Sequence, residues 1–244
     1  MKKVGKIMLL GKRNFLVDSG KQINTEFGLI DLTKVKKYGQ VVRTTTGEKF
    51  IAAEPTIKDL LSKCKRIPQI VTAKDAAQIL AVTGLQAGWN CLDLGGGSGF
   101  LTIFLANYAQ PGSVVTYEKD KKNAENIGNN VKFCDLKNVT VKNKPAEKFT
   151  EKDLDIITTD YVNAEKNVKK FFAALKPGGW LVMYSPQIEQ HQKSRKEINK
   201  MNFDYVKTIE TVQREWKVDP RGFTHPIHTQ LVHTGFMTFA RKKM

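Results

Sequence analysis

The stretch LDLGGGSGF, Leu92–Phe100, places three alternate glycines, Gly95, Gly97 and Gly99, directly after the apolar run WNCLDL. An apolar run, a glycine-rich turn and a second apolar run, SGFLTIFLANYA, predict a strand, a tight turn and a helix. Several α/β folds bind a nucleotide-like ligand at such a turn, because glycine lets a ligand approach the bare backbone. The turn therefore predicts a ligand site but does not identify the ligand.

Strands and helices alternate from about residue 74 onward. We expect helices in KDAAQILAVTGL, SGFLTIFLANYA, KDKKNAENIGNNVKFC, AEKNVKKFFAALKPGG and the polar, exposed IEQHQKSRKEINKM, and strands in WNCLDL, SVVTYE, NVTVKN, LDIITTD and WLVMYSP. Gly84 is a plausible stop for the first helix, and Pro177-Gly178-Gly179 closes the fourth. The alternation predicts an α/β fold with a doubly wound, mostly parallel sheet. FDYVKTIETVQREWKV and HTQLVHTGFMTFARK predict two long strands that add a closing antiparallel hairpin.

Residues 1–55 show a different pattern, with short β segments separated by glycine or polar pairs. This spacing predicts a small antiparallel β module. A short helix is expected at IKDLLSKC, after Pro55-Thr56. We therefore expect a small β-rich domain with a linker helix at residues 1–66 and a larger α/β domain at residues 67–244.

The net charge is +16, from 40 Lys and Arg against 24 Asp and Glu. Residues 1–75 hold 16 basic and 7 acidic side chains, residues 76–186 hold 13 and 11, and residues 187–244 hold 11 and 6. The basic flanks favour a polyanionic partner, most simply nucleic acid, although a lysine-rich proteome would produce the same excess. The sequence has no apolar run long enough for a transmembrane helix and no signal-peptide pattern, so we expect a soluble, cytoplasmic protein without membrane association.

Metal and disulfide chemistry have little support in the sequence. Cys64, Cys91 and Cys134 are odd in number, far apart and without a C-x-x-C pair, so neither a disulfide framework nor a zinc site is indicated. Cys91 lies inside a strand pattern and is expected to be a small core residue. His225-x-x-His228 suggests two ligands, but no third ligand is nearby, so we expect no metal.

The spacing of the glycines separates three possible ligands. A P-loop needs a lysine after its last glycine, and Phe100 and Leu101 follow Gly99 here, which excludes a P-loop. A dinucleotide turn needs its third glycine where Phe100 stands, which weakens that interpretation. The remaining spacing, D-x-G-x-G-x-G from Asp93, resembles the first motif of class I S-adenosylmethionine-dependent methyltransferases. In that motif the acid at Asp93 binds the ammonium group of the cofactor, directly or through water.

Two further acids stand at predicted strand ends. SVVTYE ends in Glu118, where an acid can accept both ribose hydroxyls of a dinucleotide or of S-adenosylmethionine. LDIITTD ends in Asp160, at the sheet edge that faces the transferred methyl group in this methyltransferase fold. The alternative role for Asp160 is to cap the following helix.

Nearly the full length of the chain resembles the tRNA (adenine-N1)-methyltransferases that act on the T loop. The resemblance rests on KRIPQIVTAKDAAQIL, with Gln69 and Asp75 at characteristic places, LDLGGGSGFLTIFLA, VVTYEKD and ALKPGGWLVMYSPQIEQ, and on REWKV followed by HTGFMTFARK. After this aspartate the family usually continues with a short segment that ends in Pro-Trp, whereas the segment DYVNA, which begins with Asp160, has neither residue. We therefore expect the wall of the base pocket to differ.

The resemblance implies a class I methyltransferase domain at residues 67–244, S-adenosylmethionine as cofactor and N1 of tRNA adenine 58 as target, with position 57 added in archaeal relatives. It also implies a homotetramer with tRNA lying across more than one subunit. Asp160 is the predicted catalytic residue. Tyr161, Tyr184 and His233 are candidates for the substrate pocket, and each could equally be a core residue. The predicted cofactor-binding residues are Gln69, Asp93, Gly95, Gly97, Ser98, Gly99, Phe100, Leu101, Glu118, Lys119 and Asp160.

Two other hypotheses stay open at this point. The chain could be a non-catalytic tRNA-binding partner of such an enzyme, or a methyltransferase with a different RNA, protein or small-molecule substrate. The complete glycine motif favours an enzyme, and the basic β module favours a nucleic-acid substrate.

Overall fold

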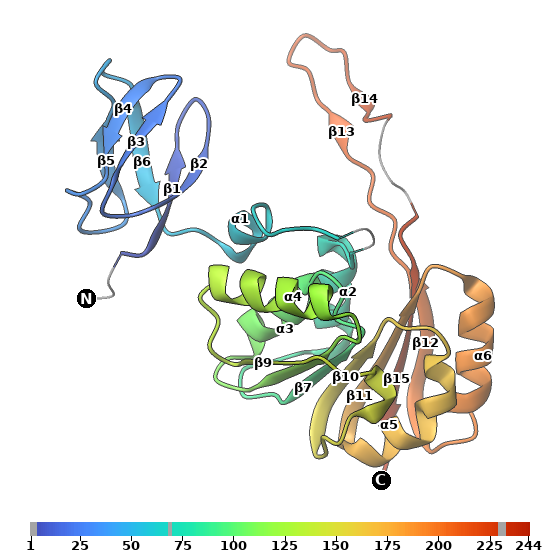
Figure 1. Cartoon of the computed structure of the whole chain (residues 1–244). Helices are drawn as coiled ribbons and strands as arrows, with labels where there is room; N and C mark the ends of the chain where they lie inside the picture. Colours follow the sequence, from blue (N-terminus) through green and yellow to red (C-terminus); the bar gives the residue numbers. More distant parts are fainter. Residues whose placement is uncertain (1–3, 68–69, 229–232) are drawn as a thin grey trace. The chain divides into compact units, whose positions relative to one another are not determined.

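The computed structural model describes residues 4–67, 70–228 and 233–244, and the chain divides into two compact units, Met1–Cys64 and Lys65–Met244. The domain boundary predicted after residue 66 lies two residues beyond this division. The first unit is the N-terminal β module, and the second carries the glycine turn. Each is described by itself (Figure 1).

The N-terminal unit is built from short antiparallel strands (Figure 1). Four of them form a sheet in the order β2-β1-β6-β5, with β1 at Lys6–Leu10, β2 at Phe15–Asp18, β5 at Gln40–Arg43 and β6 at Lys49–Ala53. A separate two-stranded ladder pairs β3, Gln22–Thr25, with β4, Gly28–Asp31. Residues alternate between the two faces of β6, so that Phe50 and Ala52 are buried in the core while Lys49 and Ile51 are exposed.

The short helix α1, Ile57–Leu61, begins where the sequence predicts it. The Thr56 hydroxyl accepts a hydrogen bond from the Asp59 backbone N–H, and the Asp59 carboxylate accepts one from the Thr56 N–H. This reciprocal capping box satisfies two backbone donors that a helix start otherwise leaves free.

The second unit contains one seven-stranded sheet in the order β12-β15-β11-β10-β7-β8-β9. Its pairs between β11 and β9 are parallel, whereas β15 lies between β11 and β12 and pairs with both in the antiparallel sense. The strands are β7 at Cys91–Leu94, β8 at Val114–Tyr117, β9 at Val139–Lys142, β10 at Leu154–Thr159, β11 at Leu175–Ser185, β12 at Phe203–Glu210 and β15 at Phe236–Lys242.

Helices cover both faces of this sheet (Figure 1). On one face, α5 and α6 contribute Phe171 and Ile198 to a core cluster with Leu92 of β7 and Leu181 of β11. The other face carries α2, α3 and α4. The helices are α2 at Ala73–Thr83, α3 at Phe100–Ala109, α4 at Lys121–Phe133, α5 at Val168–Ala174 and α6 at Ile188–Ile198, with 3-10 turns η1 at Ala146–Lys148 and η2 at Ala164–Asn167.

The predicted end of the fourth helix is wrong. α5 ends at Ala174, and the segment LKPGG belongs to β11. Leu175 already pairs with Leu154 of β10, and the register shifts before Trp180 pairs with Ile156. Gly178, with φ +80, lies within this irregularity, where a left-handed residue lets the strand bulge without ending it.

The prediction of a polar, exposed helix holds for only part of α6. One face of this polar helix buries His191, Ser194 and Ile198. His191 Nδ1 lies 2.7 Å from Thr238 Oγ1 of β15, and burial lowers the pKa of the His191 imidazole. A histidine counts as polar in a periodicity analysis, yet its hydrogen-bonded ring packs against the sheet like a core residue.

The closing hairpin is interrupted. β12 ends at Glu210, and the described residues 211–228 and 233–235, hereafter the arm, lie outside the seven-stranded sheet (Figure 1). Within the arm, β13, Trp216–Lys217, pairs with β14, His225–Pro226, as a separate ladder. REWKV is therefore not part of the long strand that the sequence predicts, and part of HTQLVH lies outside the described residues.

Other sequence expectations concern single residues and membrane helices. Gly84 adopts the left-handed conformation at the end of α2, and Cys91 is buried, both as expected. None of the helices in the described part of the chain has the length and apolar character needed to span a bilayer.

Two glycines of the second unit should respond in opposite directions to a methyl group. A Cβ at Gly96 would lie 2.4 Å from Thr116 Oγ1 and 2.7 Å from Ile127 Cδ1, whereas a Cβ at Gly128, inside α4, meets nothing within 4 Å. We expect Gly96→Ala to lower the free energy of unfolding by about 1–3 kcal/mol through overpacking. Gly128→Ala should raise it by about 0.5–1 kcal/mol, because alanine favours the helix. Urea unfolding of the full chain measures both, and a Gly96→Ala protein as stable as the wild type would contradict the close packing.

Candidate active site

The glycine turn joins β7 to α3 with a backbone that three positive φ angles shape. Gly95, Gly97 and Gly99 have φ values of +95, +53 and +79. Gly99 is the N-cap residue of α3 and has no side chain that could cap this helix end. The backbone amide groups at the start of α3 are therefore suited to bind an anion such as a carboxylate.

Gly95 also has no room for a side chain. A Cβ there would lie 2.3 Å from the backbone oxygen of Asp160, at the end of β10. Gly97 is different, because a Cβ there would meet only the Gly95 oxygen, at 4.0 Å. Gly97 therefore leaves backbone open toward the neighbouring hollow, which is the surface that a closely bound ligand requires.

Gly96 is the residue of the turn that the motif analysis missed. It lies against Thr116 and Ile127 closely enough to exclude any side chain. The backbone N–H groups of Gly95 and Gly96 both donate to the Tyr117 oxygen, at 3.0 and 3.1 Å. The signal available in the sequence was the unbroken run of three glycines. The motif spacing uses Gly95 and Gly97 of that run and leaves Gly96 unexplained.

Asp93 lies at the end of β7 and is 2 % exposed. Its two carboxylate oxygens accept hydrogen bonds from the hydroxyls of Thr102 at 2.5 Å and Thr158 at 2.7 Å. Burial raises the pKa of the Asp93 carboxyl, the two hydroxyls oppose that shift, and the charge of Glu118 adds to it. The carboxylate is thus fixed in place by two neighbouring elements and would be stabilised by a cation.

Glu118 follows β8 and is buried at the opposite side of the turn. Its Oε2 accepts from the Gly97 N–H at 2.9 Å, and its Oε1 accepts from the Asp120 N–H at 2.9 Å. The glutamate therefore holds Gly97, the second glycine of the motif, and also lines the cavity beside it. Sequence spacing predicted the position of Glu118 but not its bond to Gly97.

Asp160 stands where the end of β10 meets the turn. Its backbone N–H donates to the Leu94 oxygen at 2.9 Å. Burial raises the pKa of the Asp160 carboxyl to about 7, and the charges of Asp93 and Glu118 add to the shift. The alternative role as a helix cap is wrong, because the N-cap residues of η2 and α5 are Asn163 and Asn167.

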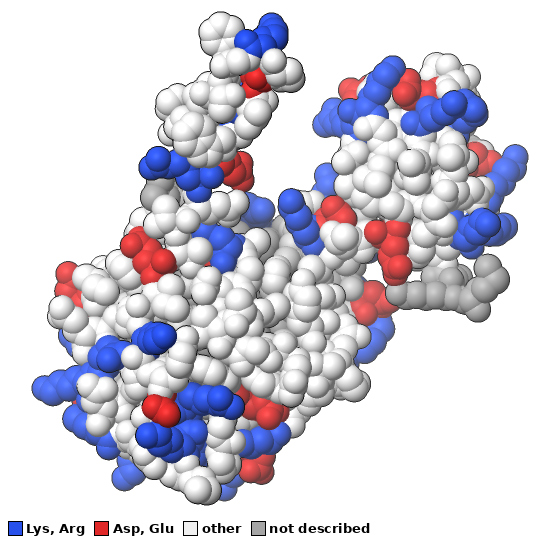
Figure 2. Space-filling model, turned by 180° about the vertical axis from the view of Figure 1, so that it is seen from behind, with Lys and Arg blue, Asp and Glu red and all other residues white. Residues whose placement is uncertain are grey.

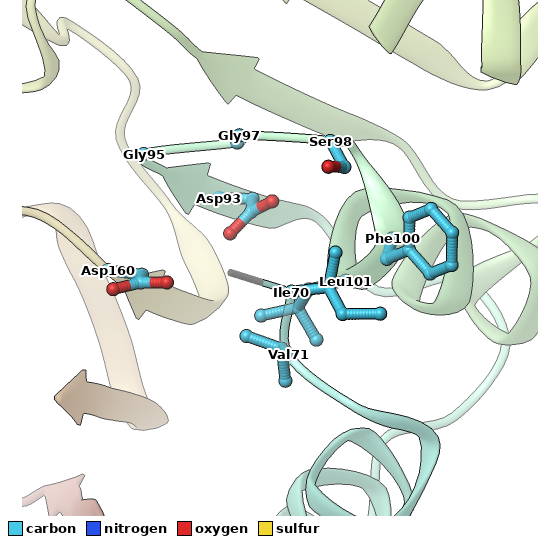
Figure 3. A pocket seen from close by; sticks show the side chains of 10 residues that line it. Ile70, Val71, Asp93, Gly95, Gly97, Ser98, Phe100, Leu101 and Asp160 are labelled. Atoms are coloured by element: carbon cyan, nitrogen blue, oxygen red, sulfur yellow. The ribbon is translucent and has the colours of Figure 1, made fainter. Parts of the chain in front are cut away.

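Three cavities meet at Asp160. The turn cavity is a small hollow against the glycines (Figure 3), lined by Ile70, Val71, Asp93, Gly95, Gly96, Gly97, Ser98, Phe100, Leu101 and Asp160. The Glu118 cavity, of about 820 Å³, has walls that include Gly95, Gly97, Tyr117, Glu118, Lys119, Asn123, Asp160, Tyr161 and Lys166. The Tyr184 cavity, of about 320 Å³, is lined by Ile70, Thr72, Asp160, Tyr184, Pro186, His233 and Thr234.

Figure 3 shows how the turn cavity is divided by chemistry. The carboxylates of Asp93 and Asp160 lie on one side, and the apolar side chains of Ile70, Val71 and Leu101 lie on the other. The turn itself, residues 95–101, contains no Lys or Arg. A site with buried carboxylates and no basic residue in its turn suits a cationic ligand and not a pyrophosphate.

The remaining predicted cofactor residues have mixed surroundings. The Ser98 hydroxyl accepts from the Ile67 N–H at 2.7 Å and so anchors the segment that precedes α2. The Phe100 ring lies 5.5 Å from the Arg66 guanidinium, and Leu101 is buried. Lys119 is exposed at the rim of the Glu118 cavity. Gln69 lies outside the described residues.

The three substrate-pocket candidates are not brought together. Tyr161 lines the Glu118 cavity, where its hydroxyl accepts from the Asn167 amide at 3.1 Å. Tyr184 and His233 line the Tyr184 cavity with Asp160. Burial raises the pKa of both tyrosines to about 12.

His233 is exposed and bridges two segments. Its Nδ1 lies 2.6 Å from Glu210 Oε1, and its Nε2 lies 3.0 Å from the Pro186 oxygen. The bond to Glu210, followed by the one to Pro186, raises the pKa of the His233 imidazole. The rings of His225 and His228 stack at 5.3 Å, and no cluster of three or more potential metal ligands occurs among the described residues.

Comparison with known proteins identifies the family of this chain. Residues 61–225, more than half of the chain, match the family described as "tRNA methyltransferase complex GCD14 subunit". The chain belongs to this family. Its fold class is likewise that of known methyltransferases, as predicted from the alternation of strands and helices.

Individual relatives of the GCD14 family cover most of the chain. It is 29% identical over 262 residues to the tRNA (adenine(57)-N(1)/adenine(58)-N(1))-methyltransferase TrmI of Methanocaldococcus jannaschii, an alignment covering 95% of this chain and 92% of that protein. It is 32% identical over 209 residues to the tRNA (adenine(58)-N(1))-methyltransferase TrmI of Thermus thermophilus, covering 84% and 81%. These relatives confirm the predicted family.

Solved structures confirm the predicted fold. A SAM-dependent O-methyltransferase from Thermotoga maritima is similar with a TM-score of 0.81 and 30% identity, over 100% of this chain and 95% of that one. The tRNA (m1A58) methyltransferase TrmI from Aquifex aeolicus is similar with a TM-score of 0.77 and 22% identity, over 100% and 99%. Both likenesses include the N-terminal β unit.

The raised pKa of Asp160 predicts a pH-dependent stability. A carboxyl with a pKa near 7 in the folded state and near 4 when unfolded binds more protons when folded, so it makes the protein less stable as pH rises from about 4 to about 7. We expect Asp160→Asn to become progressively more stable than the wild type over this range, by at most about 1.4 kcal/mol per pH unit. Urea unfolding between pH 4.5 and 8 measures this difference, and parallel curves for the two proteins would contradict it.

Proposed function

We propose that this protein transfers a methyl group from S-adenosylmethionine to N1 of adenine 58 in the T loop of tRNA. The observation that carries the proposal is the position of Asp160, where the turn cavity, the Glu118 cavity and the Tyr184 cavity meet. A single carboxylate can there contact both a cofactor and a target base. Because the M. jannaschii relative is named for positions 57 and 58, adenine 57 is a second candidate position.

The turn cavity and the Glu118 cavity fit S-adenosylmethionine. Asp93 is suited to the ammonium group, and the uncapped start of α3 is suited to the carboxylate. Glu118 and Lys119 line the larger cavity, where the Glu118 carboxylate is suited to accept hydrogen bonds from the ribose hydroxyls. The open backbone at Gly97 allows the ligand to approach closely. When bound, S-adenosylmethionine supplies an electrophilic methyl group on a positively charged sulfur.

The Tyr184 cavity is the proposed site of the target adenine. Its volume of about 320 Å³ and its mixed lining suit a flat base swung out of the RNA. Tyr184 and His233 form part of its wall, whereas Tyr161 lies in the Glu118 cavity and is less suited to contact the base. The three residues that follow Asp160 in DYVNA line the Glu118 cavity and not the Tyr184 cavity. The departure from the family therefore affects the proposed cofactor site and not the proposed base site.

Asp160 has two tasks in this scheme. Adenine N1 carries a free lone pair, so the attack needs no general base; it needs alignment and stabilisation of the positive charge that develops on the ring. The Asp160 carboxylate, when ionised, accepts a hydrogen bond from the exocyclic amine and stabilises that charge. Its pKa of about 7 makes ionisation depend on neighbouring positive charge.

The basic surface supports tRNA as the substrate. Figure 2 shows Lys and Arg side chains on the surface of each unit, with Asp and Glu dispersed among them. The excess of +16 provides the nonspecific attraction to phosphates that a tRNA-binding protein requires. The expected homotetramer stays a prediction; the exposed apolar side chains of Trp216, Val218 and Phe223 in the arm offer one surface for subunit contacts.

The direct test is incubation of the full chain with unmodified tRNA and labelled S-adenosylmethionine, followed by nucleoside analysis. We expect 1-methyladenosine, and its loss when adenine 58 of the tRNA is replaced by uridine. Asp160→Ala should lower the rate by about 100-fold or more, because it removes charge stabilisation in the transition state, while cofactor affinity is largely retained.

Asp204→Ala, which removes an exposed carboxylate on β12, is the matched control and should stay active. Absence of 1-methyladenosine from a protein that binds the cofactor would favour the non-catalytic partner subunit. Formation of 1-methyladenosine in the uridine-substituted tRNA as well would favour another position, and normal turnover by Asp160→Ala would refute the role given to Asp160.

Glu118 provides a separate test of the cofactor site. We expect Glu118→Ala to raise the dissociation constant of S-adenosylmethionine by about 10- to 100-fold, the loss that corresponds to hydrogen bonds to a charged group. Glu125→Ala, on the exposed side of α4, is the control. Calorimetry measures both, and an unchanged affinity in Glu118→Ala would mean that other residues hold the ribose.

A further inference from the structure

A buried ion pair stands beside the Tyr184 cavity and has no role in the scheme above. Lys74 Nζ lies 2.8 Å from Asp75 Oδ1, and the two side chains are 9% and 0% exposed. Neither residue is among those that line the cavity. Burying a lysine and an aspartate is costly unless each charge is fully hydrogen-bonded, so the partners of this pair are informative.

The partners come from the two ends of the arm. Lys74 Nζ donates to the Thr211 oxygen at 2.5 Å and to Thr234 Oγ1 at 2.6 Å, so its three donors are all used. Asp75 Oδ2 accepts from Thr234 Oγ1 at 2.6 Å and from Thr72 Oγ1 at 3.0 Å. The Thr234 hydroxyl thus accepts from the lysine and donates to the aspartate, and it joins both charges.

The same network continues into the cavity wall. The Thr234 backbone oxygen accepts from the Tyr184 hydroxyl at 2.7 Å. A Cβ at Gly235 would lie 2.5 Å from the Tyr184 ring, so this backbone is packed directly on the tyrosine. His233 connects Glu210 to the Pro186 oxygen. Of the seven described residues that line the cavity, five take part in these contacts: Thr72, Tyr184, Pro186, His233 and Thr234.

We propose that Lys74 and Asp75 are positioning residues for methyl transfer. Through Thr234, they hold the ends of the arm on the start of α2 and hold Tyr184 in the orientation that shapes the cavity. Loop segments need such an anchor, because a base misplaced by about 1 Å loses on the order of 100-fold in rate. The proposal rests on the proposed function, since it takes the Tyr184 cavity as the site of the target adenine.

Thr234→Val is the informative substitution. Variants of Lys74 or Asp75 leave a buried charge without its partner, which is expected to unfold the protein. Valine has the shape of threonine and removes only the hydroxyl that joins the pair to the wall. Thr234→Ser restores that hydroxyl. Thr208→Val is the matched control, because it removes a hydroxyl that is hydrogen-bonded to Thr238 in the β12–β15 pair, outside the arm.

We expect Thr234→Val to lower kcat with tRNA by about 10- to 100-fold, with the dissociation constant of S-adenosylmethionine unchanged within twofold. Thr234→Ser should recover most of kcat, and Thr208→Val should match the wild type. Thr234 is proposed to act through Tyr184. The double variant Thr234→Val with Tyr184→Phe should therefore lower kcat by less than the product of the two single fold-changes.

Hydrogen exchange of the peptide covering residues 233–236 supplies a readout that needs no substrate. We expect faster exchange in Thr234→Val than in Thr208→Val. If wild-type protein methylates adenine 58 and Thr234→Val equals Thr208→Val in kcat and in exchange, the positioning role is refuted. If the wild type forms no 1-methyladenosine, the proposed function fails, and the exchange comparison alone decides whether the pair holds the wall.

Discussion

The backbone of Gly95 packs against the backbone oxygen of Asp160, and no side chain fits between them. The same turn donates two backbone hydrogen bonds to Tyr117 at the end of β8. Three strand ends, those of β7, β8 and β10, are thereby drawn to one point. The acids at these ends are Asp93, Glu118 and Asp160. Because the close packing of Gly95 brings the strand ends together, the three carboxylates lie near one another and their charges repel.

That crowding has an electrostatic consequence for the ligands. Burial raises the pKa of the Asp93 and Asp160 carboxyls, the charge of Glu118 adds to both shifts, and that of Asp93 adds to the shift of Asp160. No Lys or Arg stands in the turn to neutralise these charges. Positive charge brought by a ligand relieves the repulsion. Both the proposed cofactor and the methylated adenine carry such a charge, so one arrangement of acids can serve binding and catalysis. The Lys74–Asp75 pair lies outside this group and neutralises itself internally.

The sequence predicts local and chemical features better than long-range ones. The order of strands and helices around Gly95, and the three acids at strand ends, follow from periodicity and motif spacing, because each depends on residues close in the chain. The extension of β11 through Pro177 and the buried face around His191 depend on partners in β10 and β15 that periodicity does not reveal. The role of Thr234 depends on residues about 160 positions away, and no local pattern marks it.

The position of β15 has a consequence for how the protein is made. Phe236–Lys242 is the last strand of the seven along the chain, yet it lies inside the sheet, between β11 and β12. During synthesis, the earlier strands can pair in turn, but β12 has no neighbour until β15 has left the ribosome. Until then, the edges of β11 and β12 are both unpaired, and they expose backbone groups that invite pairing with other chains. The nascent chain therefore exposes two unpaired strand edges from the time β12 is made until β15 has emerged.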